Sequence, residues 1–202
     1  MNNKHTLILA HGAGSPMDSD WLNDLVVKFE LRGVRVIRFE FPYMHQRRID
    51  GKRRPPNRLP ILLDSYKDII VQQSGTVFIA GKSLGGRIAT MIADACDNVV
   101  GVIAYGYPFH PPAKPENLRT EHLKTLTKPC LIVQGENDIF GKKDEWQGFG
   151  IAKHINIFPM PMANHDLKPL KKSGLSLNDT LQIAVDETIE FMSAHFMDAH
   201  ND

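Results

Sequence analysis

The sequence is best interpreted from its centre, where residues 77–86 read Val77-Phe78-Ile79-Ala80-Gly81-Lys82-Ser83-Leu84-Gly85-Gly86. The first four residues are apolar and predict a buried strand. The glycines after them match the pattern G-x-S-x-G, and an amphipathic helical pattern follows. A turn from strand to helix within about two residues strains the backbone of Ser83, and flanking glycines relieve the crowding. We therefore predict a nucleophile elbow, in which the Ser83 hydroxyl projects above a sheet and over a helix N-terminus that favours negative charge.

Two other interpretations of this stretch are weaker. Gly81-Lys82-Ser83 could end a phosphate-binding P-loop, but that motif needs a glycine where the chain has Thr76, and Gly75 comes one place too early. The P-loop also needs a loop at residues 77–80, where the apolar run predicts a strand. An ordinary tight turn without chemical function is the second alternative to the elbow.

Short apolar runs alternate with longer amphipathic segments along the chain. We expect six strands, at residues 6–10, 34–39, 77–80, 99–105, 130–133 and 155–158. Apolar residues at helical spacing predict helices within residues 21–29, 59–70, 88–95 and 177–196, with a weaker helical pattern over 118–126. Most of the predicted strands are nearly continuous aliphatic runs, as in parallel strands that are covered on both faces. The chain is therefore predicted to be an α/β protein with a mostly parallel sheet and helices on both faces, forming a single domain over residues 1–202.

Composition excludes several functional classes. The net charge of the 202 residues is +1, so no overall field attracts the protein to nucleic acid or to an anionic membrane. The N-terminal residues 1–10 contain no signal-peptide pattern, and no run approaches the roughly 20 apolar residues of a membrane span. The two cysteines, Cys96 and Cys130, are expected to be reduced. These features predict a cytoplasmic protein.

In a parallel sheet, ligands bind at the carboxyl ends of the strands, so the residues after each strand matter most. The first predicted strand is followed by His11-Gly12-Ala13-Gly14. A glycine-rich turn at this place can bring the backbone N–H of Ala13, or of Gly14 after a shift of one residue, beside Ser83. Together with the N–H of Leu84 it would form an oxyanion hole. The alternative is a flexible turn, and His11 is expected to brace this loop.

An acid and a base follow the last two predicted strands. Asp138, with Glu136 as its nearest rival, follows the fifth strand and could fix the tautomer of a histidine. His165 follows the sixth strand at the same end of the sheet and could act as the general base for Ser83. The chain order serine, acid, histidine is that of the triads of α/β-hydrolases. No HExxH or other closely spaced ligand pattern occurs, so neither a metal nor a cofactor is expected.

Taken together, these segments resemble a small α/β-hydrolase without a lid, similar to dienelactone-hydrolase-like proteins. The resemblance covers roughly residues 5–198 and implies Ser83 as nucleophile, Asp138 as acid and His165 as base. Dienelactone hydrolases carry cysteine where this chain has Ser83. Phe41-Pro42-Tyr43 and Arg53-Arg54-Pro55-Pro56 also resemble the branch that contains the testis-expressed hydrolase-like proteins. That branch includes subunits of chromatin-modifying assemblies, so a catalytically silent scaffold for a protein partner is the alternative.

Loops at the same end of the sheet are expected to form the pocket, with no cap above it. Aromatic residues that follow the second and fourth strands, Tyr43 and Tyr107, are expected to contact substrate. Basic residues between Arg47 and Arg58, above all Arg53 and Arg54, could attract an anionic substrate, or could simply be solvated or paired with acids. The predicted function is hydrolysis of a small carboxylic ester or thioester. A homodimer is compatible with this sequence, which does not fix the oligomeric state.

Overall fold

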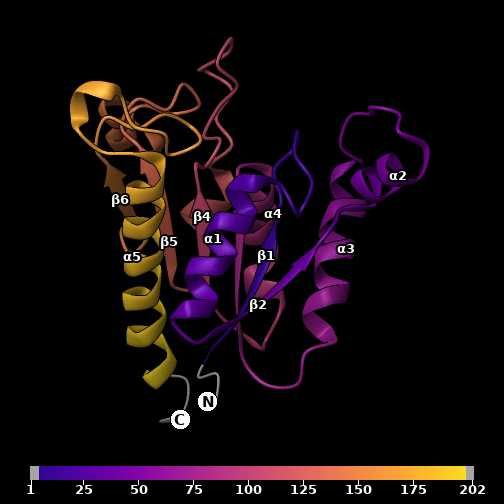
Figure 1. Cartoon of the computed structure of the whole chain (residues 1–202). Helices are drawn as coiled ribbons and strands as arrows, with labels where there is room; N and C mark the ends of the chain where they lie inside the picture. The colour runs from indigo at the N-terminus through magenta and orange to yellow at the C-terminus, as the bar shows by residue number, and fades with distance from the viewer. Residues whose placement is uncertain (1–4, 199–202) are drawn as a thin grey trace.

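The computed structural model describes residues 5–198, which fold around one parallel sheet of six strands in the order β2-β1-β3-β4-β5-β6 (Figure 1). The strands are β1 (His5–Ala10), β2 (Val34–Phe39), β3 (Val77–Lys82), β4 (Val99–Tyr105), β5 (Cys130–Gly135) and β6 (Asn156–Met160). The three central strands β3, β4 and β5 are almost entirely buried, which explains their aliphatic sequences. The predicted parallel α/β architecture is confirmed.

Helices cover both faces of the sheet. One face packs against α1 (Asp20–Leu31) and α5 (Leu177–Asp198), and the other against α3 (Leu59–Val71) and α4 (Leu84–Ile92). The long helix α5 begins with a capping box, in which the backbone N–H of Ser176 donates to Asp179 and the Asp179 N–H donates to the Ser176 hydroxyl. The sheet is thus enclosed between two apolar layers.

Two connections differ from the expected ones. Residues 118–126 contain only a short 3-10 helix, η2 (Glu121–Lys124), which agrees with the weakness of their helical pattern. Conversely, the segment after β2 forms a helix, α2 (Pro42–Asp50), that we did not expect. It begins with a proline at its first turn, where the missing N–H costs nothing, and ends at Gly51 with φ 69°. Three more 3-10 helices lie within the described residues: η1 (Ala93–Ala95), η3 (Lys143–Phe149) and η4 (Lys171–Ser173).

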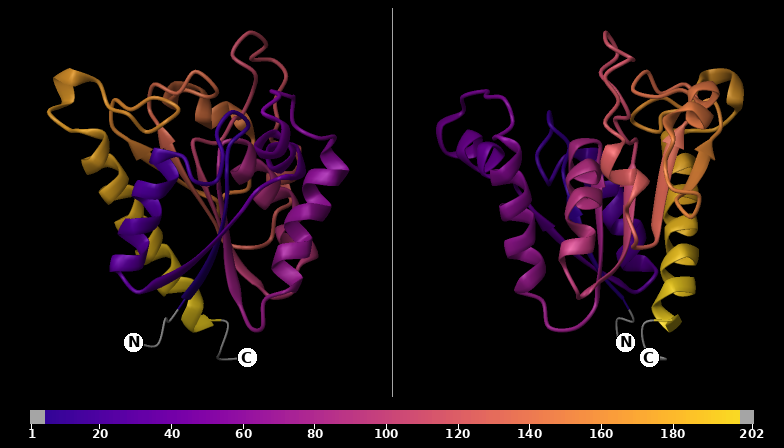
Figure 2. Two further views of the ribbon diagram at one scale, coloured as in Figure 1. Left: turned by 45° about the vertical axis from the view of Figure 1, so that its right-hand side comes forward. Right: turned by 180° about the vertical axis from the view of Figure 1, so that it is seen from behind.

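All six strands run in the same direction, so the loops after their carboxyl ends gather at one end of the molecule (Figure 2). Within residues 5–198, no additional domain is inserted over this end. None of the helices in this range is both long and apolar enough to cross a membrane. Residues 1–4, where we expect no targeting segment, lie outside the described residues.

Candidate active site

Ser83 lies in the sharp turn between β3 and α4, with φ 51° and ψ −112°. A non-glycine residue rarely adopts this conformation, and it persists only when its surroundings enforce it. The neighbouring glycines show why the turn is so tight. A Cβ on Gly81 would lie 2.2 Å from the backbone carbon of Gly85, and one on Gly85 would lie 2.7 Å from the carbonyl oxygen of Ala10. Strand and helix therefore approach so closely that only glycine fits, and Ser83 is displayed at the end of the sheet.

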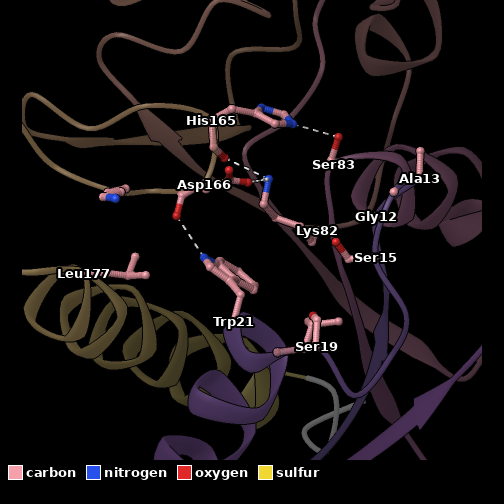
Figure 3. A pocket seen from close by; sticks show the side chains of 13 residues that line it. Gly12, Ala13, Ser15, Ser19, Trp21, Lys82, Ser83, His165, Asp166 and Leu177 are labelled. Carbon is pink, nitrogen blue, oxygen red and sulfur yellow. Dashed lines mark hydrogen bonds and ion pairs between the residues drawn. The ribbon is translucent and has the colours of Figure 1, made fainter.

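The imidazole of His165 lies between Ser83 and Asp138. Its Nε2 is 2.9 Å from the Ser83 Oγ, and its Nδ1 is 2.7 Å from Asp138 Oδ2. Figure 3 shows the His165 ring directed at the serine from the opposite wall of the pocket. The three side chains come from the ends of β3, β5 and β6, and the sheet brings them into one hydrogen-bonded line. A ring of Phe140 packs on the imidazole with centroids 4.3 Å apart and limits its rotation.

Asp138 is fully buried and its carboxylate is held by further donors. The side-chain amide of Gln134 donates to Oδ2 over 2.8 Å, and the backbone N–H of Phe140 donates to Oδ1 over 2.9 Å. Its rival Glu136 points elsewhere, because it pairs with Lys143 and accepts the N–H of Met162. Of the two acids that the sequence left open, the structure therefore brings Asp138 to the histidine.

These contacts determine where the hydrogens lie. A carboxylate can only accept, so the hydrogen of His165 lies on Nδ1, and Nε2 is free to accept from the Ser83 hydroxyl. This is the tautomer in which an imidazole can remove the proton of a nucleophile. The arrangement can therefore activate Ser83 for attack on an electrophilic carbon.

The loop after β1 lies against the serine. A Cβ on Gly12 would be 3.7 Å from the Cβ of Ser83. His11 braces this loop, as the sequence predicted: its Nδ1 donates to the carbonyl of Gly12, and its Nε2 accepts the N–H of Phe41. Burial lowers the pKa of His11, which keeps the ring neutral in this role. The Tyr43 hydroxyl supports the same turn from the other side, donating to the carbonyl of Ala13 over 3.1 Å.

A pocket of about 460 Å³ opens beside Ser83 and His165. Ala13 and the Gly12 and Gly14 backbone form one wall, and the loop after β6 forms the other (Figure 3). Its apolar surface comes from helices α1 and α5, through Trp21, Leu22 and Leu177. The pocket is therefore largely a product of the β1–α1 loop and the two helices on one face of the sheet.

The residues expected to contact substrate lie elsewhere. Tyr107 is fully buried and its hydroxyl donates to the carbonyl of Arg119, while Tyr43 is 3% exposed and supports the loop after β1. Neither they nor Arg53 and Arg54 line the pocket beside Ser83. This corrects the expectation of an aromatic wall after β2 and β4. Those aromatic side chains pack into the core on the α3 and α4 face, where burying large apolar rings stabilises the fold.

Two basic residues of the segment after β2 are paired with acids. Arg48 forms ion pairs with Asp18 and Glu40, and Arg54 pairs with Asp50 over 2.6 Å. These pairs agree with the alternative that the sequence left open, a charged surface neutralised by neighbouring carboxylates.

Three residues of the site escaped the sequence analysis. Trp21 falls on the apolar stripe of its predicted helix. Lys82 was considered only as part of the turn at Ser83, and Gln134 directly follows the predicted strand 130–133 without an assigned role. The signal for the last two is a polar residue at the end of an otherwise apolar buried strand, which is costly unless it has a partner. Both have one: Gln134 holds Asp138, and Lys82 contacts the His165 loop.

Both cysteines of the chain are core residues. Cys96 and Cys130 are both buried and unpaired, and burial raises the pKa of the Cys130 thiol to about 12. Over the described residues 5–198, no group of three or more His, Cys, Asp or Glu side chains is arranged to hold a metal ion.

Comparison with known proteins agrees with this geometry. Residues 3–193 match the model of a family described as alpha/beta hydrolase domain. The fold is similar to that of a dienelactone hydrolase from Anabaena variabilis, with a TM-score of 0.69, 18% identity, and coverage of 95% of this chain and 86% of that chain. It is also similar to a lidless α/β serine hydrolase from Xanthomonas campestris, with a TM-score of 0.68, 17% identity, and coverage of 93% and 82%. A third similar structure is the esterase domain of a Rhodothermus marinus protein, with a TM-score of 0.69, 13% identity, and coverage of 96% of this chain and 88% of that chain.

At these identities the solved structures establish the fold alone, whereas the family model spans nearly the whole sequence. No cap domain is inserted in the fold over residues 5–198, and the chain belongs to the alpha/beta hydrolase domain family.

Proposed function

We propose that this protein hydrolyses small carboxylic esters or thioesters through an acyl-enzyme on Ser83. The observation that carries the proposal is the continuous hydrogen-bonded line from Ser83 Oγ through His165 to Asp138. A serine hydroxyl is a weak nucleophile unless an adjacent base takes its proton, and an imidazole oriented by a buried carboxylate is such a base.

In the first half of the proposed reaction, Ser83 Oγ attacks the carbonyl carbon as its proton passes to His165 Nε2. The carbonyl oxygen becomes an oxyanion, for which the backbone N–H groups of Ala13 and Leu84 are the expected donors. Leu84 is the first residue of α4, so its N–H has no acceptor within the helix. Each such donor contributes about 3–4 kcal/mol to lowering the barrier.

Collapse of the tetrahedral intermediate breaks the bond to the leaving group, which takes the proton from His165. Water then enters, gives a proton to Nε2, and attacks the acyl carbon. The second collapse releases the carboxylic acid and returns the proton to Ser83. Asp138 stays ionised throughout and stabilises the imidazolium that forms twice in the cycle.

The pocket supports a small acyl group with an apolar portion. Trp21, Leu22 and Leu177 line it, and its volume of about 460 Å³ is within the usual range for small-molecule sites. Dienelactone hydrolase and esterase activities are properties of the structural relatives. For this chain they support ester chemistry.

A fluorophosphonate probe tests the proposal, because it phosphonylates activated serines. We expect the purified protein to be labelled at Ser83, and Ser83→Ala to abolish labelling and lower ester turnover by about four to six powers of ten. Ser74→Ala is the matched control: Ser74 is exposed in the turn between α3 and β3, and its replacement should leave both readouts unchanged.

An unlabelled wild-type protein that also leaves p-nitrophenyl esters and acyl-CoA thioesters of graded chain length intact would contradict the proposal. That result would favour the scaffold alternative instead.

A further inference from the structure

Lys82 directly precedes Ser83 and sends its side chain into the same site. It ends β3, its side chain is only 10% exposed, and its ammonium lines the pocket. The Nζ donates to the main-chain carbonyl of His165 over 2.8 Å and lies 3.2 Å from Asp166 Oδ1 (Figure 3). One lysine thus links the strand that carries the candidate nucleophile to the loop that carries the candidate base.

The His165 loop depends on such links because its backbone is strained on both sides of the histidine. Met162 has φ 52° and Leu167 has φ 57°, a region that side chains other than glycine adopt only when contacts hold them there. The Asn164 side chain stabilises the loop from within by accepting the N–H groups of Asp166 and Lys168. These bonds fix the shape of the loop and leave its place relative to Ser83 to contacts from outside.

Two side-chain hydrogen bonds from outside the loop reach the main-chain carbonyls of His165 and Asp166. The indole N–H of Trp21 in α1 donates to the carbonyl of Asp166 over 2.8 Å, and Lys82 holds the carbonyl of His165 itself. The ammonium also lies 5.8 Å from the centre of the Trp21 ring. Of the two, only Lys82 belongs to the same strand–turn unit as Ser83, so it joins the main chain of His165 directly to the strand that carries the serine.

The lysine also places a positive charge close to the imidazole. A Cβ on Gly106 would be 3.2 Å from Lys82 Nζ and 3.3 Å from His165 Nδ1, so the two groups flank the same point. The other charged groups around the ring are Asp138 from the loop after β5, and Asp166 and Lys168 from its own loop. Burial lowers the pKa of Lys82, while the carboxylates of Asp166 and Asp138 oppose that effect.

We propose that Lys82 is a positioning residue for the reaction: its ammonium holds the His165 carbonyl so that Nε2 stays aligned on Ser83 Oγ, and its charge favours the neutral imidazole that a general base must be. The proposal rests on the proposed function of Ser83. The Asp166 side chain is 66% exposed, so removal of the lysine leaves that carboxylate in solvent and not as an unpaired buried charge.

Steady-state kinetics of Lys82→Met across pH test this role. We expect kcat to fall about 10- to 100-fold with KM changed less than about 3-fold, because loss of alignment acts on the chemical step. The acid limb of the pH profile should move to higher pH by about one unit, since a cation no longer opposes the imidazolium. Asp166→Asn keeps the bond to the His165 carbonyl but removes a negative charge, and should move the same limb to lower pH.

Lys171→Met is the matched control, because Lys171 is an exposed lysine in the same loop segment and lies outside the pocket. It should leave kcat and the pH profile unchanged. An unaltered kcat and pH profile in Lys82→Met would overturn the proposal. So would a rise in KM at constant kcat, which would mean that the ammonium binds substrate. If Lys82→Met does not fold, the pH profile of Asp166→Asn provides the test. An acid limb that lies at the same pH as in the wild type, or at a higher pH, would overturn the proposal.

The fluorophosphonate probe separates this failure from failure of the proposed function. Wild-type protein that is not labelled at Ser83 contradicts both proposals. Wild-type and Lys82→Met proteins labelled at the same rate contradict only the role of Lys82.

Discussion

The candidate site depends on a different physical condition for each of Ser83, His165 and Asp138. The serine needs a backbone conformation that only close glycine packing enforces, with φ 51°. The imidazole needs a fixed tautomer, which the fully buried carboxylate of Asp138 provides. The carboxylate in turn needs donors to replace lost solvent, and Gln134 and the N–H of Phe140 supply them.

Asp138→Asn should lower kcat by roughly four powers of ten while leaving the fold intact. The asparagine amide is nearly isosteric, but an NH₂ group facing His165 Nδ1 favours the tautomer whose Nε2 carries a hydrogen and cannot accept from Ser83. Ester hydrolysis and circular dichroism of the same preparation check both expectations. Glu136→Gln, which alters the other acid of this turn, should retain most of the activity. Equal losses in the two variants would contradict the assignment of Asp138.

Among the elements, the strand–turn–helix unit β3–α4 depends on close backbone contact with β1. Gly85→Ala should destabilise the protein by roughly 3 kcal/mol, because its new Cβ would lie 2.7 Å from the carbonyl oxygens of Ala10 and His11. Urea unfolding measures the change. Gly14→Ala is the control, since a Cβ there meets nothing within 4 Å, and its stability should stay within about 0.5 kcal/mol of wild type.

Helix α3 is joined to the sheet by the buried hydroxyl of Tyr66. This group lies 2.7 Å from the carbonyl oxygen of Ala80 and 2.9 Å from that of Ile8, and it accepts the N–H of Ala80. Tyr66→Phe should therefore lower the free energy of unfolding by about 1–3 kcal/mol. The m value, which is the slope of that free energy against urea concentration, should not change. A urea midpoint equal to that of wild type would show that these strand groups are satisfied without the hydroxyl.

For the molecule as a whole, acidification should reduce stability before the carboxyl groups titrate. Burial lowers the pKa of His122 from 6.5 in the unfolded chain to about 4 in the folded protein, so the unfolded state binds more protons between these values. Stability attributable to this neutral histidine is present above pH 6.5 and is lost as the pH falls toward 4.

Urea unfolding at pH 7.5 and pH 5.5 checks this expectation, with His122→Gln as the comparison. The variant should show a smaller decrease between the two pH values than the wild type does. Because burial lowers the pKa of His11 in the same direction, some decrease should remain in the variant. An identical decrease in the two proteins would contradict the role of His122.

The local pattern of residues was sufficient for the six strands, the main helices and the turn at Ser83. Aliphatic runs and helical spacing are properties of neighbouring residues, and the G-x-S-x-G turn is a local steric requirement. Because parallel strands end on one side of a sheet, the sequence also predicts that Ser83, Asp138 and His165 lie at the same edge.

The pocket walls depended on packing between distant segments. Tyr43 and Tyr107 follow strands, as pocket residues do. Both side chains are nevertheless buried in the apolar layer that includes α3 and α4. Trp21 and Lys82 reached the site because α1 and the end of β3 meet the His165 loop across the fold. The burial of a side chain and the groups that it contacts depend on how the whole chain packs. A periodic pattern indicates that a residue is apolar or polar without specifying which distant groups surround it.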